Sequence, residues 1–433
     1  MDNTKLYAII AVAVLVVAGV GAYLAFGGGS DEYRSTNTDG RLTILGNANE
    51  DDYLDDEDVK TLEEMISENK YTVMADANDD GVIDQKDIDM VKEIIDVKEY
   101  NKNKSDSDKK SMTVNYITVD GDVSSAKYPV SKMIILNTQR SLGLAIAIGA
   151  GDNVVGINDF IKSYWDKNLF KDYEGLPSVG DRKEPSIEDI LKINADTVYS
   201  GTAKTYGLNL DGNTVGDKQI LRLTTWENGR LAEGALMLGF FTDNDSGAHK
   251  YVKWVDDVIA DLDEKLDKVQ DKTATKFYLG TPTYMYAQSD GVSTAMSASG
   301  ATNVGNVICT DPSKGGMSVS ACLEDILDAN PQYIVAGKYM YTHMTSTEVK
   351  EMYDTLDYSK FAITDGYKNG KISMVNYDLP FCIQTLIAAH IFFPDAVSMD
   401  DVEESIEYYL DNFCDTNGYE FDIDNFIYFP DGY

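Results

Sequence analysis

The sequence contains none of the short motifs that mark the common enzyme classes. GxSxG, GxGxxG, HExxH and the P-loop pattern are all missing, and only three histidines could exchange protons near neutral pH. Carboxylates are so abundant that pairs of them carry no information about catalysis. We therefore do not expect an enzyme.

Cysteine is scarce, and its spacing excludes the usual zinc sites. The four cysteines form no CxxC or Cys/His pattern. An even number permits disulfides in three pairings, and buried free thiols are an equally good interpretation. The redox state of these residues stays open: Cys309, Cys322, Cys382 and Cys414.

Basic residues are too few for nucleic-acid binding. The chain has 37 Lys and Arg against 73 Asp and Glu, a formal net charge of -36. A phosphate backbone is bound by clustered positive charge, so DNA and RNA are unfavoured partners. The length of 433 residues indicates two or three domains.

The start of the chain predicts a membrane anchor in residues 1–30. Tyr7 to Phe26 contains no charge and no proline, which is long enough to span a bilayer as a helix. Lys5 precedes this run and Asp31 follows it, so the bulk of the chain should lie outside the cell. A cleaved signal peptide is the alternative, but the glycine run at 27–29 is typical of a tether.

Residues 40–100 predict a small all-α domain with two calcium loops. In the second loop, alternate oxygen-bearing side chains and a glycine at the sixth position suit a hard cation with six to eight oxygen ligands. The first loop has Asn at its first position and Asp52 in place of the glycine, so it should bind more weakly. The expected ligands are Asn47, Asn49, Asp51, Tyr53, Asp55 and Asp58, and Asp76, Asn78, Asp80, Val82, Asp84 and Asp87.

Two such EF-hand-like loops resemble a dockerin domain, because each loop has Asp at its twelfth position and is followed by a helix. The resemblance implies Ca²⁺ as a cofactor and makes a cohesin-like module a further candidate partner. Positions 10 and 11 of the loops often contact the cohesin partner in dockerins. Here they carry unusual residues, Asp56 and Glu57 in the first loop and Gln85 and Lys86 in the second. A polar linker at 101–111 follows.

From about Met112 the pattern changes to short apolar strands alternating with helices, which predicts parallel βαβ units. A segment is repeated: IEDILKINADTVYSG at 187–201 and LEDILDANPQYIVAG at 323–337 share six of 15 positions. Two similar lobes are expected, at 112–242 and 271–433. Between them, 243–270 predicts one long amphipathic helix.

The segment PSVGDRKEPSIEDILKINADTVYS, the long helix and the second LEDIL segment resemble the substrate-binding proteins of iron-siderophore and cobalamin ABC importers. The resemblance implies an α/β fold of two Rossmann-like lobes joined by one helix, in the class III periplasmic-binding-protein manner. It also implies an ABC permease and ATPase as partners and a metal chelate or corrinoid as ligand. An anchor helix in place of a lipidated cysteine suits an archaeal cell surface.

Ligands of such sheets bind beyond the carboxyl ends of the strands, where two facing lobes form a cleft. The loops at these ends carry cations and aromatic rings, which suit a flat anionic ligand. One imidazole is too few for a bare metal ion. The predicted ligand-binding residues are Arg140, Lys204, Tyr206, Trp226, Tyr284, Tyr286, Tyr339, Tyr341 and His343.

Two equivalent glutamates of the repeat are candidates for docking onto the permease. The resemblance implies one surface Glu on each lobe, and Glu188 and Glu324 hold the same place in the repeat. Helix-dipole carboxylates are the alternative role. A surface assembly protein that acts through its dockerin-like domain remains the competing function.

Overall fold

The computed structural model describes residues 36–430, except 37, 171–172, 174, 225–229, 339 and 417. The predicted anchor in residues 1–30, Trp226 and Tyr339 therefore lie outside the described residues. Within the described ranges, no helix is both long and apolar enough to cross a membrane. The chain divides into two compact units, one made of residues up to Glu99 with Val114–Ser125, the other of Tyr100–Thr113 with Ala126–Tyr433.

The first unit contains the two predicted loops, each followed by a helix. Helix α2 spans Asp56–Glu68 and α3 spans Gln85–Asn101. Asp55 caps α2, because its side chain accepts a hydrogen bond from the Glu57 amide. A small apolar core joins loops and helices, and its buried members are Ala48, Val59, Leu62, Met65, Ala75, Ala77, Ile88 and Val91.

A β-strand also belongs to the first unit, which the sequence did not predict. Strand β1, Met112–Ile117, pairs with β2, Val123–Tyr128. Tyr116 forms a bridge with Ile44, and the Asn115 side chain donates to the Ala77 carbonyl, 2.9 Å away. One strand thus contacts both loop regions.

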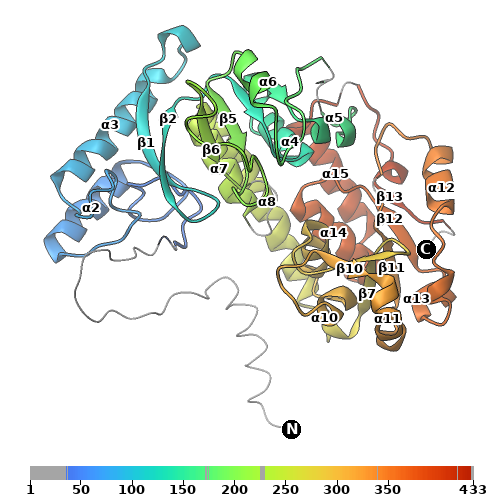
Figure 1. The fold of residues 1–433 in the computed structure, drawn as a ribbon. Helices are drawn as coiled ribbons and strands as arrows, with labels where there is room; N and C mark the ends of the chain where they lie inside the picture. Colours follow the sequence, from blue (N-terminus) through green and yellow to red (C-terminus); the bar gives the residue numbers. More distant parts are fainter. Residues whose placement is uncertain are drawn as a thin grey trace. The chain divides into compact units, whose positions relative to one another are not determined.

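The second unit contains two α/β lobes, as the sequence predicts (Figure 1). The first lobe has a parallel four-stranded sheet in the order β4-β3-β5-β6, with every pair parallel. Its elements are β3 Met133–Ile135, α4 Gln139–Ala147, β4 Val154–Ile157, α5 Asp159–Tyr164, α6 Ile187–Lys192, β5 Thr197–Ser200 and β6 Gln219–Arg222.

The second lobe has a seven-stranded mixed sheet in the order β10-β8-β7-β11-β12-β13, with β9 paired to β7. Its central strands β7, β11 and β12 are parallel, and β13 adds an antiparallel edge. Its strands are β7 Lys276–Gly280, β8 Tyr284–Tyr286, β9 Thr302–Asn303, β10 Gly316–Ser318, β11 Tyr333–Ala336, β12 Ile372–Val375 and β13 Ile427–Tyr428. Its helices are α9 Gly291–Ser297, α10 Val304–Ile308, α11 Leu323–Ala329, α12 Ser346–Asp354, α13 Asp365–Lys368, α14 Phe381–Phe392 and α15 Met399–Phe413.

The repeated segment forms the same substructure in both lobes. The first copy is α6 followed by β5, and the second is α11 followed by β11. Each strand is interior, since β5 lies between β3 and β6 and β11 lies between β7 and β12. The shared apolar positions Ile190 and Ile326, and Val198 and Ile334, are buried, whereas Leu191 is 48% exposed.

One long helix connects the lobes. Helix α7, Leu231–Thr242, is almost wholly buried and leads into α8, Asp245–Leu266, which lies within the predicted range 243–270. In Figure 1, α8 runs from the side of the first lobe to the second. Trp254 of α8 stacks on Tyr409 of α15, with ring centroids 5.6 Å apart. The connecting helix is thus anchored in the second lobe by aromatic contacts.

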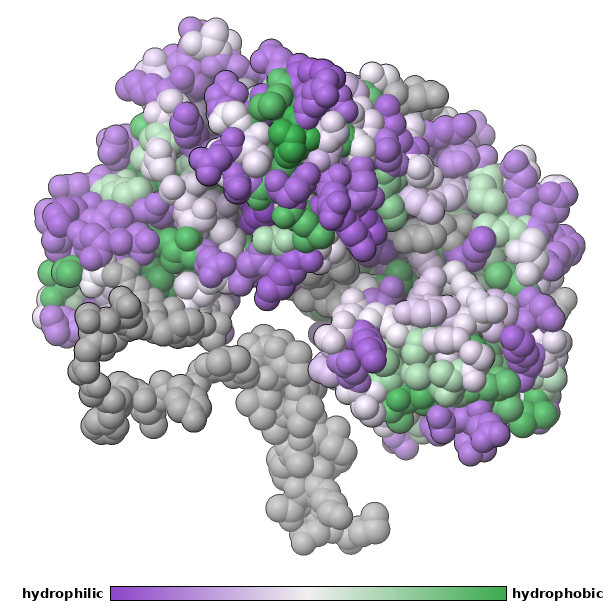
Figure 2. All heavy atoms as spheres, in the orientation of Figure 1, coloured by the Kyte–Doolittle hydropathy of each residue, from purple (hydrophilic) through white to green (hydrophobic). Residues whose placement is uncertain are grey.

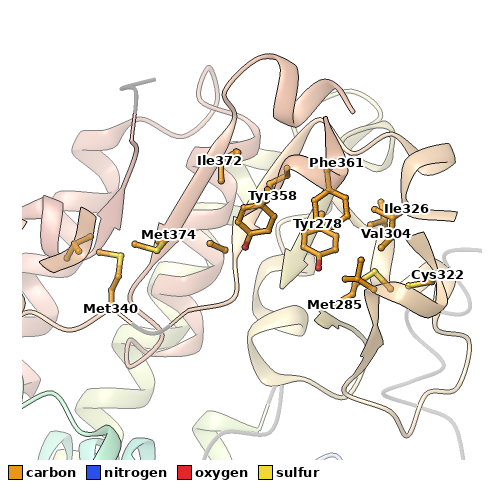
Figure 3. Packing of buried hydrophobic residues seen from close by; sticks show 14 residues of the cluster. Tyr278, Met285, Val304, Cys322, Ile326, Met340, Tyr358, Phe361, Ile372 and Met374 are labelled. Carbon is orange, nitrogen blue, oxygen red and sulfur yellow. The ribbon is translucent and has the colours of Figure 1, made fainter. Parts of the chain in front are cut away.

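The second lobe has a dense apolar core. Figure 3 shows Tyr278, Tyr358 and Phe361 with Met285 and Val304 at the core of the mixed sheet. The buried Tyr358 hydroxyl donates to the Gly280 carbonyl at 2.6 Å, so this polar group is satisfied. On the face in Figure 2, hydrophilic residues predominate, in keeping with the net charge of -36.

Gly247 tests the junction between α8 and the first lobe. A Cβ atom at this position would lie 2.1 Å from the Ile148 carbonyl oxygen, so Gly247→Ala must displace backbone. We expect a loss of about 1–3 kcal/mol in the free energy of unfolding, measured by denaturant titration. Gly212→Ala is the control, because nothing lies within 4 Å of its Cβ. Equal stability of the two variants would contradict this packing.

Candidate functional site

A pocket lies between the two lobes at the carboxyl ends of the parallel strands. Loops and helix starts that follow β3, β4 and β5 form one wall, and the start of α9 forms the other. The pocket contains about 570 Å³ of space not filled by protein atoms, part of it open to solvent. Its lining residues are Thr138, Gln139, Arg140, Phe160, Arg182, Tyr206, Asp290, Gly291 and Val292.

Two guanidinium groups face this pocket. Arg182 lies over the Phe160 ring, 3.7 Å from its centroid, and 5.6 Å from the centroid of the Tyr206 ring. Arg140 donates from Nε and Nη2 to the Tyr377 carbonyl, at 3.2 and 2.8 Å. The Arg182 guanidinium therefore stacks on an aromatic ring, and both arginines carry a permanent positive charge. In so acidic a chain, two of them in one pocket indicate a site for an anion.

One carboxylate also lies at the pocket. Asp290 caps α9, accepting hydrogen bonds from the Val292 and Ser293 amides at 3.0 Å each. Burial raises the pKa of the Asp290 carboxyl, while the amide of Ser293 and the charge of Arg140 oppose that shift. Its Oδ1 atom orders the start of α9, and its charge is felt by Arg140 across the pocket.

The predicted ligand-binding residues are distributed over several places. Arg140 and Tyr206 line the pocket, whereas Lys204 is exposed on the loop after β5. Tyr284 is 43% exposed on β8, and Tyr286 donates its hydroxyl to the Gly337 carbonyl.

Tyr341 and His343 lie together at the lobe junction. Their rings stack with centroids 5.3 Å apart. The His343 Nδ1 atom lies 3.6 Å from Asp166 Oδ1, a buried carboxylate of the first lobe. Neither residue lines the described pocket.

Phe160, Arg182 and Asp290 are among the pocket residues that were not predicted. Arg182 lies in the segment VGDRKEP, downstream of the isolated bridge between Ile157 and Ser178, which brings that segment beside the end of β4. The signal available in the sequence was a cation close to a strand end. It was overlooked because the segment itself does not form a strand.

Direct hydrogen bonds cross from one lobe to the other near the pocket. Gln139 Nε2 donates to Asp378 Oδ1 at 2.7 Å, and both residues are buried. Asp166 accepts from the Thr342 backbone amide and, at 2.7 Å, from its hydroxyl. With Arg140 on the Tyr377 carbonyl, these contacts join the strand-end loops of the two lobes.

The second of the two predicted calcium loops has an ordered network of hydrogen bonds. Asp76 is buried and accepts from the amides of Asp80 and Gly81, at 3.0 and 2.8 Å. Gly81 has a φ of +88°, which explains why glycine occupies the sixth position. Asp87 at the twelfth position accepts from the amides of Asn78 and Asp84, at 3.2 and 2.8 Å.

The first loop repeats much of this network. Asp58 accepts from the amides of Asn49 and Asp55, at 3.2 and 2.9 Å, which are the matching positions. The fifth-position carboxylate also accepts from the seventh-position amide in each loop, from Tyr53 to Asp51 and from Val82 to Asp80. The two loops therefore have corresponding backbone arrangements over these positions.

The two loops differ where the sequence differs. The Oδ1 atom of Asn47 is buried without a donor among the described residues. Asp52 forms an ion pair with Arg41. In the second loop Lys86 contacts Asp80 and Asp84, with Nζ–O distances of 2.9 and 3.5 Å.

Carboxylates alone do not form a metal site here. Within the described ranges, no group of three or more His, Cys, Asp or Glu is placed to hold a metal ion. The loops offer a mixed set of carboxylate, amide and carbonyl oxygens, which is the donor chemistry of Ca²⁺. Burial raises the pKa of Asp58 to about 6 and also raises the pKa of Asp87. A cation would favour the ionised form of both groups.

The predicted docking glutamates are both exposed, in the first turns of α6 and α11. Glu188 forms an ion pair with Lys192, with an Nζ–O distance of 2.9 Å. Such an exposed pair contributes little to stability, so Glu188 is available to a partner.

Several periplasmic binding proteins of known structure have a fold similar to that of the two lobes. The periplasmic binding protein FepB from Veillonella parvula, described as TroA-like, has 12% identity and a TM-score of 0.54 over 69% of this chain and 96% of its own. The molybdate-bound periplasmic protein MolA from Haemophilus influenzae has 17% identity and a TM-score of 0.55 over 71% and 99%. CeuE from Helicobacter pylori, in a nickel–histidine complex, has 18% identity and a TM-score of 0.52 over 70% and 96%. Among curated proteins, none matches the sequence.

The sequence itself identifies the family. A model of the periplasmic binding protein family matches residues 134–371, more than half of the chain. The chain belongs to the periplasmic binding protein family, whose members are solute-binding proteins and not enzymes. This confirms the coarse part of the prediction, a two-lobed substrate-binding protein of the ABC-importer class. The match leaves the first unit without a family, so its dockerin-like character stays a prediction.

Proposed function

We propose that this protein captures an anionic metal chelate, either an iron chelate such as a siderophore or haem, or a corrinoid, for an ABC permease and ATPase. The observation that carries the proposal is the pocket with Arg140 and Arg182 beside the rings of Phe160 and Tyr206. Guanidiniums supply charge-assisted hydrogen bonds and the rings supply apolar faces. A chelate with acidic groups around a flat or aromatic body matches both.

A bare transition-metal ion suits the pocket less well. Its described lining contains one carboxylate, Asp290, and no histidine or cysteine. Zinc and manganese prefer several nitrogen, oxygen or sulfur donors around one point. The two neighbouring positive charges would also repel a free cation. The ligand we propose therefore brings its own metal-binding groups.

Arg182 provides the test of this ligand class. We expect Arg182→Ala to weaken binding at least tenfold, because a charge-assisted hydrogen bond contributes about 1.5–3 kcal/mol. Arg182→Lys should recover part of the loss, since lysine keeps the charge but not the flat group over Phe160. Tryptophan fluorescence should be titrated with a ferric catecholate, a ferric hydroxamate, haem and cobalamin.

Lys183→Ala is the matched control, because Lys183 is the exposed neighbour of Arg182. It should bind like the unaltered protein. Equal affinity of Arg182→Ala, or tight binding of free zinc or manganese that is lost in His343→Ala, would refute the chelate assignment.

We also propose that the two loops of the first unit bind Ca²⁺, more weakly at the first loop. The support is the shared hydrogen-bond network, the buried carboxylates Asp58, Asp76 and Asp87, and the buried Asn47 Oδ1 atom without a donor. An oxygen of this kind is costly to bury unless something binds to it. Asn47 also has one negative charge fewer than Asp76, which lowers the attraction for a divalent cation.

Calorimetric titration of the full-length chain with Ca²⁺ should detect two sites. Asp76→Ala with Asp87→Ala should remove the tighter site, and Asn47→Asp should strengthen the weaker one. Protons compete with Ca²⁺ for ionised carboxylates. Because burial raises the pKa of Asp58 to about 6, the affinity of the first loop for Ca²⁺ should fall as the pH falls through this value. Asp96→Asn, an exposed change on α3, should have no effect. Unchanged calcium uptake by the double variant would exclude these ligands.

We further propose that Glu188 and Glu324 dock the two lobes onto the permease. Both are exposed, and both stand at the start of equivalent helices. Reversing both charges to Lys should abolish uptake and leave ligand affinity unchanged, because neither residue lines the pocket. Glu264→Lys is the control, an exposed glutamate on α8 that also faces a lysine. Normal uptake by the double variant would argue against docking at these residues.

A further inference from the structure

Asp378 is a fully buried carboxyl group at the lobe junction. It lies in the loop after β12 and is 3% exposed. Its Oδ1 atom accepts the hydrogen bond from Gln139 of the opposite lobe, while its Oδ2 atom has no donor among the described residues. A buried carboxylate with one oxygen unpaired is costly in its ionised form.

The acceptors around Asp378 outnumber the donors. Gln384 donates both of its side-chain bonds to backbone carbonyls, those of Tyr377 and Leu379, and its own Oε1 atom is buried without a donor. The Oε1 atom of Gln139 is likewise buried without a donor among the described residues. Asp378 and Gln384 line one small cavity together with Arg140. A proton on Oδ2 of Asp378 would add a hydrogen-bond donor to a cavity wall in which acceptor oxygens outnumber donors.

The charged and titratable groups around Asp378 act in opposite directions. Burial has the largest effect and raises the pKa of Asp378 to about 7. The Gln139 hydrogen bond and the positive charge of Arg140 on α4 lower this pKa, whereas the negative charge of Asp166, after α5, raises it. Burial raises the pKa of Tyr409 on α15 well above its ordinary value, and the negative charge of Asp378 adds a smaller rise. Burial thus moves the titration of Asp378 from the acid range towards neutral pH.

We propose that Asp378 is a proton-operated clasp between the two lobes: the neutral acid keeps the junction closed, and the ionised carboxylate loosens it. Opening hydrates the carboxyl group and returns its pKa towards the ordinary value of about 4. The closed junction therefore binds the proton more tightly than the open one, so acid favours closure and alkali favours opening. With pKa values of about 7 closed and about 4 open, the open-to-closed ratio rises roughly tenfold between pH 6 and pH 8.

This clasp does not depend on the identity of the ligand. Its effect on capture rests on the proposed function, because Gln139 lines both the clasp and the proposed pocket. If the pocket takes up a chelate, its retention should weaken as pH rises. The clasp can be tested without any ligand, so its failure and that of the proposed function are distinguishable.

The Thr342 amide is a suitable reporter. It donates to Asp166 across the junction, so its hydrogen exchange measures junction opening. Asp378→Asn keeps the shape of the side chain, retains an acceptor for Gln139 and supplies an N–H donor, which mimics the neutral acid at every pH. We expect the variant to protect Thr342 better than the unaltered full-length chain at both pH values, because it does not ionise when the junction opens. This advantage should grow roughly tenfold between pH 6 and pH 8.

Two further variants separate titration from packing. Asp328→Asn, an exposed change on α11, should match the unaltered protein at both pH values. Gln139→Leu removes the donor to the ionised carboxylate, so the pH midpoint of opening should move to higher pH. A purely structural role would lower protection equally at all pH values.

A constant protection ratio between Asp378→Asn and the unaltered chain from pH 6 to pH 8 would overturn the proposal. If Asp378→Asn does not fold, the Gln139→Leu midpoint decides, and an unshifted midpoint would overturn the proposal as well. A junction whose opening follows potassium or sodium concentration rather than pH would instead identify a cation site and refute the proton clasp.

Discussion

The close packing of α8 is the constraint on which the arrangement of the second unit depends. A single helix carries the connection between the lobes, so its buried face determines how the lobes lie relative to one another. At its start, Ala248 fits against Gly239 of α7, where a Cβ on the glycine would come within 2.4 Å. Further along, Trp254 stacks on Tyr409. The strand-end loops face one another because both ends of this helix are held.

The charge of the groups that line the pocket differs from that of the chain as a whole. A net charge of -36 would repel an anion at long range, yet two guanidiniums lie together where the lobes meet. Salt screens the distant carboxylates within about 8–10 Å, whereas the partly enclosed pocket keeps its local charge. The anion binding proposed above would therefore depend on the few charges that line a pocket of about 570 Å³ more than on the acidic surface.

Periodic and repeated features were predictable from the sequence, and contacts between distant segments were not. The duplicated helix–strand segment and the long helix were found because their apolar positions recur at regular spacing. Arg140 and Tyr206 were found because they follow strands. Phe160, Arg182 and Asp290 come from a helix, an irregular segment and a helix cap, and only the fold brings them together. The bridge between Tyr116 of β1 and Ile44 was not predictable, because it joins segments more than 70 residues apart.

The short edge strand β13 has a consequence for the order of assembly during synthesis. It pairs with β12, and the Asn376 amide donates to the Phe426 carbonyl, so the loop that carries Tyr377 and Asp378 is completed by residues some fifty positions later. Domains form from the amino end as the chain emerges from the ribosome. The first lobe and its two arginines can therefore fold before the loop of Tyr377, whose carbonyl accepts from Arg140, has been synthesised. That loop gains its backbone hydrogen bond to Phe426 only after some fifty further residues have been added.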